Sequence, residues 1–197
     1  MTTEEKIFNA ARIVFQKKGF AGARMQEIAD EAGINKAMLH YCFKNKELLF
    51  QAVFMNAFSQ LAPQINEIFN SQDSIFDKIK KFTHSYISFV MLNPYLPQFV
   101  IQEMNNNPEF VMSFLKNENR PNPTLLITQI EKEIAAGIIK PINPKHLLMN
   151  MISMTVFPFA AQMMIKGILQ ISDTEFNQMM EERKTNIAEQ IINSIKR

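Results

Sequence analysis

The chain has no tryptophan and contains only one cysteine, three histidines and five glycines among its 197 residues. With a single cysteine, Cys42, no internal disulfide can form, and this usage is typical of a reducing cytoplasm, where we expect the protein to reside. Few glycines, together with long apolar stretches that lack two-residue alternation, favour an all-α fold. An apolar fraction of 47% is enough for a sizeable core and excludes wholesale disorder.

The sequence also lacks the common motifs of catalysis. No HExxH, G-x-S-x-G, P-loop or CxxC pattern is present. His40, His84 and His146 lie far apart in the chain, although convergence in space stays possible. We therefore predict no enzyme activity, no cofactor and no metal site. We also expect no secretory signal, because polar residues 2–5 precede any apolar run, and no membrane span, because the apolar stretch Leu147–Ile171 contains several polar residues.

The positive charge is concentrated near the start of the chain. Residues 1–50 carry eight Lys and Arg against six Asp and Glu, whereas the remainder carries thirteen of each sign. By itself an excess of two describes only a solvated surface. The excess is informative because four of these residues bracket a candidate DNA-reading helix, at positions where phosphates would lie: Arg24, Lys36, Lys44 and Lys46.

Residues 28–46 have the pattern of a helix, a tight turn and a second short helix. Gly33 tolerates the left-handed backbone that ends the first helix, and Asn35 can cap the second. Leu39 and Cys42 follow at helical spacing, so we expect both to pack back onto the first helix as buried anchors. Apolar anchors inside and polar side chains outside are typical of a helix-turn-helix.

The flanking sequence predicts an N-terminal three-helix head. A first helix is expected from about Glu4 to Lys18, followed by Met25–Ala32 and the reader helix Lys36–Phe43. A long helix then runs from Asn45 to about Phe69. We place the DNA-binding domain at residues 1–46 and a helical effector-binding and dimerisation domain at residues 47–197.

Four Asn-Pro pairs divide the rest of the chain. Each is read as a helix start, because Asn is a favoured cap and Pro is preorganised for the first helical turn; a loop turn is the alternative for any one of them. A last helix begins at Ser172, where Glu175 completes a capping box. The count is about nine helices. The pairs are Asn93-Pro94, Asn107-Pro108, Asn122-Pro123 and Asn143-Pro144.

The helix that starts at Asn143 is apolar on nearly all sides, so it must be covered on all sides. A second subunit is the simplest cover, with the last helix beside it in a four-helix interface of a twofold dimer. The residues expected at this interface are Leu148, Ile152, Phe176, Met180, Ile187, Ile191 and Ile195.

About a quarter of the chain resembles the head of the tetracycline-repressor (TetR) family of transcriptional regulators. The residues that carry the resemblance are Phe15, Gly19, Phe20, Met25 to Ala29, Ala32 to Lys36, Leu39 and Phe43 to Phe50. The body resembles the family only in its helix count and in Ala136 to Ile139.

The resemblance implies that two reader helices of a homodimer bind a palindromic site on double-stranded DNA. It assigns Arg24, Met25 and Gln26 to the start of the positioning helix, near a phosphate. It assigns Lys36, Ala37, Met38, His40 and Tyr41 to the groove, and Lys44 and Lys46 to the DNA backbone. Three departures are visible: Ala23 and Arg24 replace the usual threonines, the aromatic of the reader helix is shifted by one position, and Ala37 and Met38 replace a common Gly-Thr pair.

The resemblance further implies an effector cavity in the body, which we expect to take an apolar or amphipathic small molecule. For any single candidate the sequence favours ordinary core, and the resemblance implies that some of the set line a cavity. The candidate lining is Phe89, Tyr95, Phe99, Met104, Phe110, Phe114, Met154, Phe157 and Gln162. The predicted function is that of a ligand-released repressor. The alternatives are a transcriptional activator and a protein-interaction module whose head has lost DNA binding.

Overall fold

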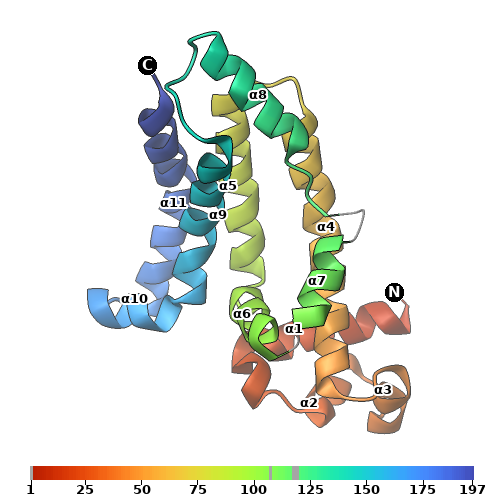
Figure 1. The fold of residues 1–197 in the computed structure, drawn as a ribbon. Coiled ribbons are helices and arrows are strands. Elements are labelled where there is room, and N and C mark those ends of the chain that lie inside the picture. Colours follow the sequence, from red (N-terminus) through yellow and green to blue (C-terminus); the bar gives the residue numbers. More distant parts are fainter. Residues whose placement is uncertain (1, 107, 117–119) are drawn as a thin grey trace.

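The computed structural model describes residues 2–106, 108–116 and 120–197, and shows the predicted all-α architecture (Figure 1). The head lies at the bottom of the figure and consists of α1 (Thr3–Gly22), α2 (Met25–Ala32) and α3 (Lys36–Cys42). From the head, α4 (Lys46–Asn70) rises through the body and turns into the antiparallel α5 (Ile75–Leu92).

The remaining helices complete the body. Two short helices, α6 (Leu96–Asn106) and α7 (Pro108–Lys116), lie between the head and α8 (Thr124–Ala135), which crosses the top of Figure 1. On the side of α5 away from α4, α9 (Pro144–Ala160) and α11 (Asp173–Ile195) pack against α5, and α10 (Gln162–Leu169) projects from them.

The capping residues predict most helix starts. Thr2, Asn35, Asn45, Asn143 and Ser172 each cap the following helix with the side chain, as expected. The prediction for Asn93-Pro94 is wrong: Asn93 ends α5, and α6 begins only at Leu96.

The described part of the chain contains eleven helices rather than about nine. One reason is that the apolar segment after Asn143 breaks at Ala161 into α9 and α10. Among the described residues, no single helix is long and apolar enough to cross a membrane, and α9 with α10 meets that test only as a pair bent by 76°.

The core of the head extends beyond the three helices. Phe20 folds back after Gly19, whose φ of 66° and ψ of 174° are open to glycine alone, and its ring contacts Phe15 and Phe50. Phe50 belongs to α4, so the core does not break at the domain boundary predicted after residue 46. That boundary stays a prediction.

One anchor of the reader helix differs from expectation. Cys42 is exposed, so its assignment as a buried anchor is wrong. The next residue, Phe43, packs into the core instead, with its ring 5.9 Å from that of Phe8. The helix ends at Cys42 and the chain becomes extended at Phe43, which turns the larger side chain inward.

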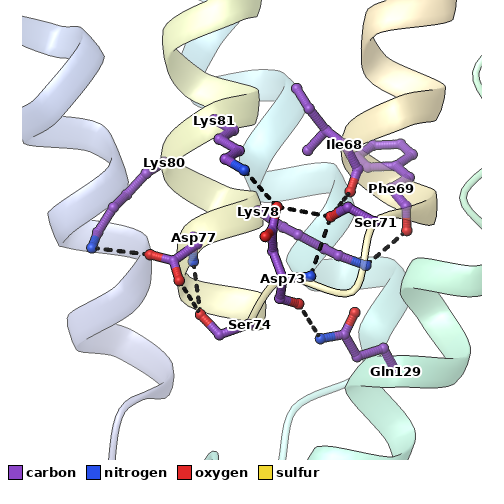
Figure 2. Close-up of polar contacts among 10 residues, drawn as sticks. All are labelled: Ile68, Phe69, Ser71, Asp73, Ser74, Asp77, Lys78, Lys80, Lys81 and Gln129. Carbon is purple, nitrogen blue, oxygen red and sulfur yellow. Dashed lines mark hydrogen bonds and ion pairs between the residues drawn. The ribbon is translucent and has the colours of Figure 1, made fainter.

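The turn between α4 and α5 is held by buried polar contacts (Figure 2). Lys78 is buried, and its ammonium donates a 2.8 Å hydrogen bond to the carbonyl of Phe69 in the last turn of α4. A cation at this end is favoured by the helix dipole, while desolvation lowers the pKa of Lys78. Asp73 accepts from Ser71 and Lys81 through its carboxylate and from Gln129 of α8 through its carbonyl. The upper end of α4 is therefore fixed to α5 and α8.

The apolar stripe of α11 faces its own subunit. Five of the seven residues predicted at a subunit interface are buried within this single chain, so that part of the prediction is wrong: Phe176, Met180, Ile187, Ile191 and Ile195. The stripe packs mainly against α5. Of the seven predicted interface residues, Leu148 and Ile152 of α9 keep surface that a partner could cover.

Candidate nucleic-acid interface and ligand cavity

The reader helix α3 is placed by the turn that precedes it. Gly33 adopts the left-handed conformation with φ 66° and ψ 34°, which lets the Ile34 amide donate to the carbonyl of Ala29 at 3.0 Å. The Asn35 side chain accepts from the amide of Met38 at 2.7 Å. Leu39 is fully buried beneath the helix. These contacts turn the opposite face of α3 toward solvent.

That outer face carries the side chains predicted to read the groove. Lys36, Ala37, Met38, His40 and Tyr41 are all exposed, and Tyr41 retains 90% of its accessible surface. Cationic, methyl and aromatic groups therefore lie together on one exposed helix face, as contact with base edges in a major groove requires.

His40 has a defined orientation. Its Nδ1 lies 3.3 Å from the carbonyl oxygen of Lys44, and because a carbonyl can only accept, Nδ1 is the donor in this contact. In the neutral ring Nε2 is then an acceptor directed away from the loop. Such an acceptor matches the amino groups of adenine and cytosine in the major groove.

Lys46 has a role in the fold beyond the one expected. Its ammonium lies 2.9 Å from the carbonyl of Phe20, 3.4 Å from that of Ala21 and 3.2 Å from that of Ala23, and 4.6 Å from the centre of the Phe20 ring. All three donors of the ammonium are directed at the end of α1. The ammonium of Lys46 therefore fixes the end of α1, while its assignment to the DNA backbone stays a prediction, and exposed Lys44 is a second backbone candidate in this loop.

We expect Lys46→Met to lower the free energy of unfolding by about 1.5–3 kcal/mol, because hydrogen bonds to the charged group are lost while the carbonyls stay in place. Urea denaturation at fixed protein concentration measures the change. Lys44→Met, which removes an exposed lysine from the same loop, is the matched control. Equal stability of the two variants would contradict the structural role of Lys46.

The start of the positioning helix α2 is mixed in character. Arg24 and Gln26 are exposed, as a phosphate contact requires. Met25 is the first residue of α2, as expected, and its side chain is half-buried against the head core, so its closeness to a phosphate stays a prediction that concerns the helix N-terminus. The Glu27 carboxylate accepts from the backbone amide of Arg24 at 3.4 Å and from Lys18 at 2.9 Å, and the Lys18 hydrogen bond is the largest cause of its lowered pKa.

An apolar cavity of about 350 Å³ lies in the body between α4, α5, α6 and α9. Three of the predicted lining residues, Phe89, Met104 and Phe110, do line it. The residues that sequence reasoning missed are Phe54, Phe58, Tyr86, Val90, Leu96, Pro97, Val100, Ile101 and Val156. Phe54 and Phe58 carried a signal, because their spacing of four residues places both on one face of α4.

The other predicted lining residues lie elsewhere. Tyr95 and Phe99 are buried in the head core, and half-buried Met154 packs into the body core. Phe157 is exposed, and Gln162 begins α10 away from the cavity. These assignments are wrong, whereas the side chain of Phe114 lies outside the described residues.

Two buried residues of the head core also belong to the cavity wall. Leu96 of α6 and Phe54 of α4 line the cavity and also pack in the cluster that contains Phe15 and Phe50. The neighbouring Phe99 ring stacks 3.8 Å from that of Phe50. A shift of the cavity wall is therefore transmitted directly into the packing of the head, since close-packed interiors transmit strain.

Burial affects the tyrosines near these sites. Desolvation raises the pKa of Tyr86 from 10.0 to about 12, and the pKa of Tyr95 is raised by the same cause. Because the folded pKa exceeds the unfolded one, the stability contributed by neutral Tyr86 is complete below pH 10 and is lost between pH 10 and 12. We expect the free energy of unfolding to fall less steeply over this range in Tyr86→Phe than in the unsubstituted protein. Urea titrations from pH 9 to 12 test this, and identical slopes would contradict it.

The geometry of the head agrees with comparisons to known proteins. The family model described as "Bacterial regulatory proteins, tetR family" matches residues 7–53, which include α2, α3 and the start of α4. The HTH-type transcriptional regulator RutR of Escherichia coli K12 is 27% identical over 192 residues, which cover 95% of this chain and 90% of RutR. The head of the chain, residues 7–53, is that of the TetR family. The protein is a helix-turn-helix transcriptional regulator.

Two further similarities agree with this assignment. IcaR of Staphylococcus epidermidis, a negative transcriptional regulator of the biofilm operon icaADBC, is 24% identical over 75% of this chain and 73% of its own. The structure of FadR from Bacillus subtilis in complex with stearoyl-CoA shares the fold with a TM-score of 0.65 at 16% identity, over 95% of this chain and 97% of FadR. The TetR-family assignment thus rests on the head, while the body shares its overall architecture.

Proposed function

We propose that this TetR-family regulator is a homodimeric repressor that reads a palindromic operator through α3. The observation that supports this most strongly is the exposed face of Lys36, Ala37, Met38, His40 and Tyr41 on a helix whose other face is locked into the head. Within the described residues, nothing covers this face. Repression is the proposed sign because IcaR, which matches three quarters of the chain, is a negative regulator.

We further propose that a small molecule in the apolar cavity releases the operator. The top of α4 is held to α5 and α8 by Lys78 and Asp73, whereas its lower end carries the head. A ligand that displaces Leu96 or Phe54 would therefore move the head and not the top of the body. Release of the operator then requires that the ligand bind more tightly to the conformation of the protein that does not fit DNA.

The lining of the cavity indicates the chemistry of this ligand. None of its twelve lining residues carries a charge, and the hydroxyl of Tyr86 is the only polar side-chain group among them. The ligand that fits is apolar within the cavity and carries at most one hydrogen-bonding group there. FadR, which shares the fold, was solved with stearoyl-CoA, whose acyl chain is a group of this kind.

A second copy of the chain is proposed to cover the exposed apolar surface of α9 and α10. In Figure 1 α10 projects from the body, and Met163 and Ile168 on it retain 79% and 71% of their surface. The other exposed apolar residues of this surface are Met149, Ile152, Phe157, Met164 and Leu169. An apolar surface of this extent on a DNA-binding protein with a palindromic target is best explained by a dimer.

We expect Ile152→Asp to convert the dimer into a monomer, because a carboxylate at the interface would be buried without a partner. Sedimentation velocity at micromolar concentration measures the change. Leu125→Asp, which places the same charge on the exposed surface of α8, is the control and should stay dimeric. If the Ile152→Asp protein remained a dimer, the proposed interface on α9 would be contradicted.

The experiment that tests operator recognition is selection of duplexes from a random DNA library by the purified protein. The expected result is a palindrome with half-sites about one helical turn (~10 base pairs) apart. Transcription in vitro from a promoter that overlaps this site then tests whether the protein represses transcription. An increase in transcription would identify an activator. No enrichment at low salt would identify the protein-interaction module instead.

Ligand release is tested with a cavity-filling variant. Val156→Phe narrows the cavity from the α9 side, and it should bind the selected operator like the unsubstituted protein. In a screen of uncharged apolar compounds, those that release the unsubstituted protein should fail to release Val156→Phe. Release of both proteins by the same compounds would place the effector elsewhere.

A further inference from the structure

A second cavity, of about 370 Å³, lies where the head meets the body. We call it the junction cleft. It is bounded by α1 on the head side and by α4 and α5 on the body side, and of its lining residues only Phe89 also lines the apolar cavity. The cleft therefore opens on a different part of the α4–α5 pair and touches the DNA-binding head directly.

The chemistry of the junction cleft is opposite to that of the apolar cavity. Most of its sixteen lining residues carry hydrogen-bonding side chains, and no Asp or Glu is among them. Arg12 of α1 supplies a permanent positive charge, and His84 of α5 adds a second when protonated. The polar lining consists of Asn9, Arg12, Asn56, Gln60, Gln64, His84, Ser85, Ser88, Asn93 and Tyr95.

Arg12 is not used by the fold. In the described part of the chain its guanidinium forms no ion pair and no hydrogen bond. Its charge partly offsets the burial that raises the pKa of Tyr95, another residue that lines the cleft. A guanidinium with five unused donors is suited to bind a carboxylate or a phosphate in a bidentate manner.

Other polar groups of the cleft are also available to a ligand. The side chains of Asn56 and Gln60 on α4 and of Ser88 on α5 make no hydrogen bond within the described structure. They present amide and hydroxyl groups around the position that Arg12 reaches. The lining thus offers one charge and several hydrogen bonds, which is the complement of a small polar anion and not of an apolar molecule.

We propose that the junction cleft binds a small organic anion, a carboxylate or a phosphate ester, held by Arg12 from the head and by Asn56 and Ser88 from the body. Such a ligand bridges the two parts of the molecule and favours the head orientation in which the cleft is formed. By linkage, the factor by which the anion changes the affinity for DNA equals the factor by which DNA changes the affinity for the anion. The site is separate from the proposed apolar effector site and does not depend on it.

The test uses citrate and glucose 6-phosphate as probes, in isothermal titration calorimetry at constant ionic strength set with chloride. At least one probe is expected to bind the unsubstituted protein with a one-to-one stoichiometry per chain. Binding of citrate alone would identify a carboxylate site, and binding of glucose 6-phosphate alone a phosphate site. Failure of both probes to bind above the chloride background would overturn the proposal.

Two variants assign the binding to the cleft. Arg12→Gln should raise the dissociation constant at least tenfold, and Asn56→Asp, which is almost isosteric, should abolish binding by placing a like charge opposite the anion. Lys6→Gln removes an exposed charge from α1 outside the cleft and should bind as before. Unchanged binding by Arg12→Gln or Asn56→Asp would overturn the assignment.

Anion binding in the junction cleft can be distinguished experimentally from effector binding in the apolar cavity. Val156→Phe should retain anion binding, because Val156 lines only the apolar cavity. Thermal melting and binding to the selected operator show that each variant is folded. Adding the bound probe should change the operator affinity of the unsubstituted protein and of Lys6→Gln, but not that of Arg12→Gln.

Discussion

Replacing Phe50 by alanine is expected to lower the free energy of unfolding by about 3–5 kcal/mol. Phe50 is fully buried, and its ring lies 4.5 Å from that of Phe15, 5.2 Å from Phe20 and 3.8 Å from Phe99. These partners come from the C-terminal half of α1 and from α6, so the cavity cannot close by a small movement of one helix. The loss is of the same order as the whole stability of many domains.

Urea denaturation followed by circular dichroism measures this change, at one protein concentration because a dimer gains stability with concentration. Tyr41→Ala is a matched control, since it also truncates an aromatic ring but at a position that is 90% exposed. Its stability should stay within about 0.5 kcal/mol of the unsubstituted protein. A Phe50→Ala protein as stable as Tyr41→Ala would contradict the shared core of head and body.

The same Tyr41→Ala substitution is expected to weaken binding to the selected operator by about 30-fold or more. A contact to a base edge is worth about 1–3 kcal/mol, and a dimer loses it in both half-sites. Fluorescence anisotropy with the selected duplex, at a fixed salt concentration, measures the dissociation constant. Because the fold is unaffected, the change reports on the interface alone.

Leu125→Ala is the control for this measurement, because Leu125 is an exposed residue of α8 at the end of the body away from the head. It should bind the operator like the unsubstituted protein. His40→Ala should reduce the preference at one base pair of each half-site and leave binding to unrelated DNA unchanged. Equal operator affinity of Tyr41→Ala and Leu125→Ala would show that α3 does not enter the groove as proposed.

Local sequence signals determined most of the helical framework. A capping side chain forms its hydrogen bond within three residues, so Thr2, Asn35 and Ser172 mark helix starts whatever the rest of the chain does. Gly33 marks the turn for the same reason, since its left-handed conformation is a property of one residue. The exposed face of α3 was predictable from the helical spacing of polar and apolar residues within this one short helix.

Which apolar residues face solvent, a cavity, the subunit core or a partner was decided by the tertiary structure. Residues of both α9 and α11 are predicted from the sequence to face a partner, yet the apolar stripe of α11 packs on α5 whereas residues of α9 stay exposed. Lys46 likewise reads as a surface cation until the end of α1 places three carbonyls around it. Burial and cavity lining depend on contacts between residues far apart in the chain, and periodicity reports only that a face is apolar. The sequence by itself therefore determined the helices and the reading head, while their packing decided the cavity, the junction cleft and the surface left for a second subunit.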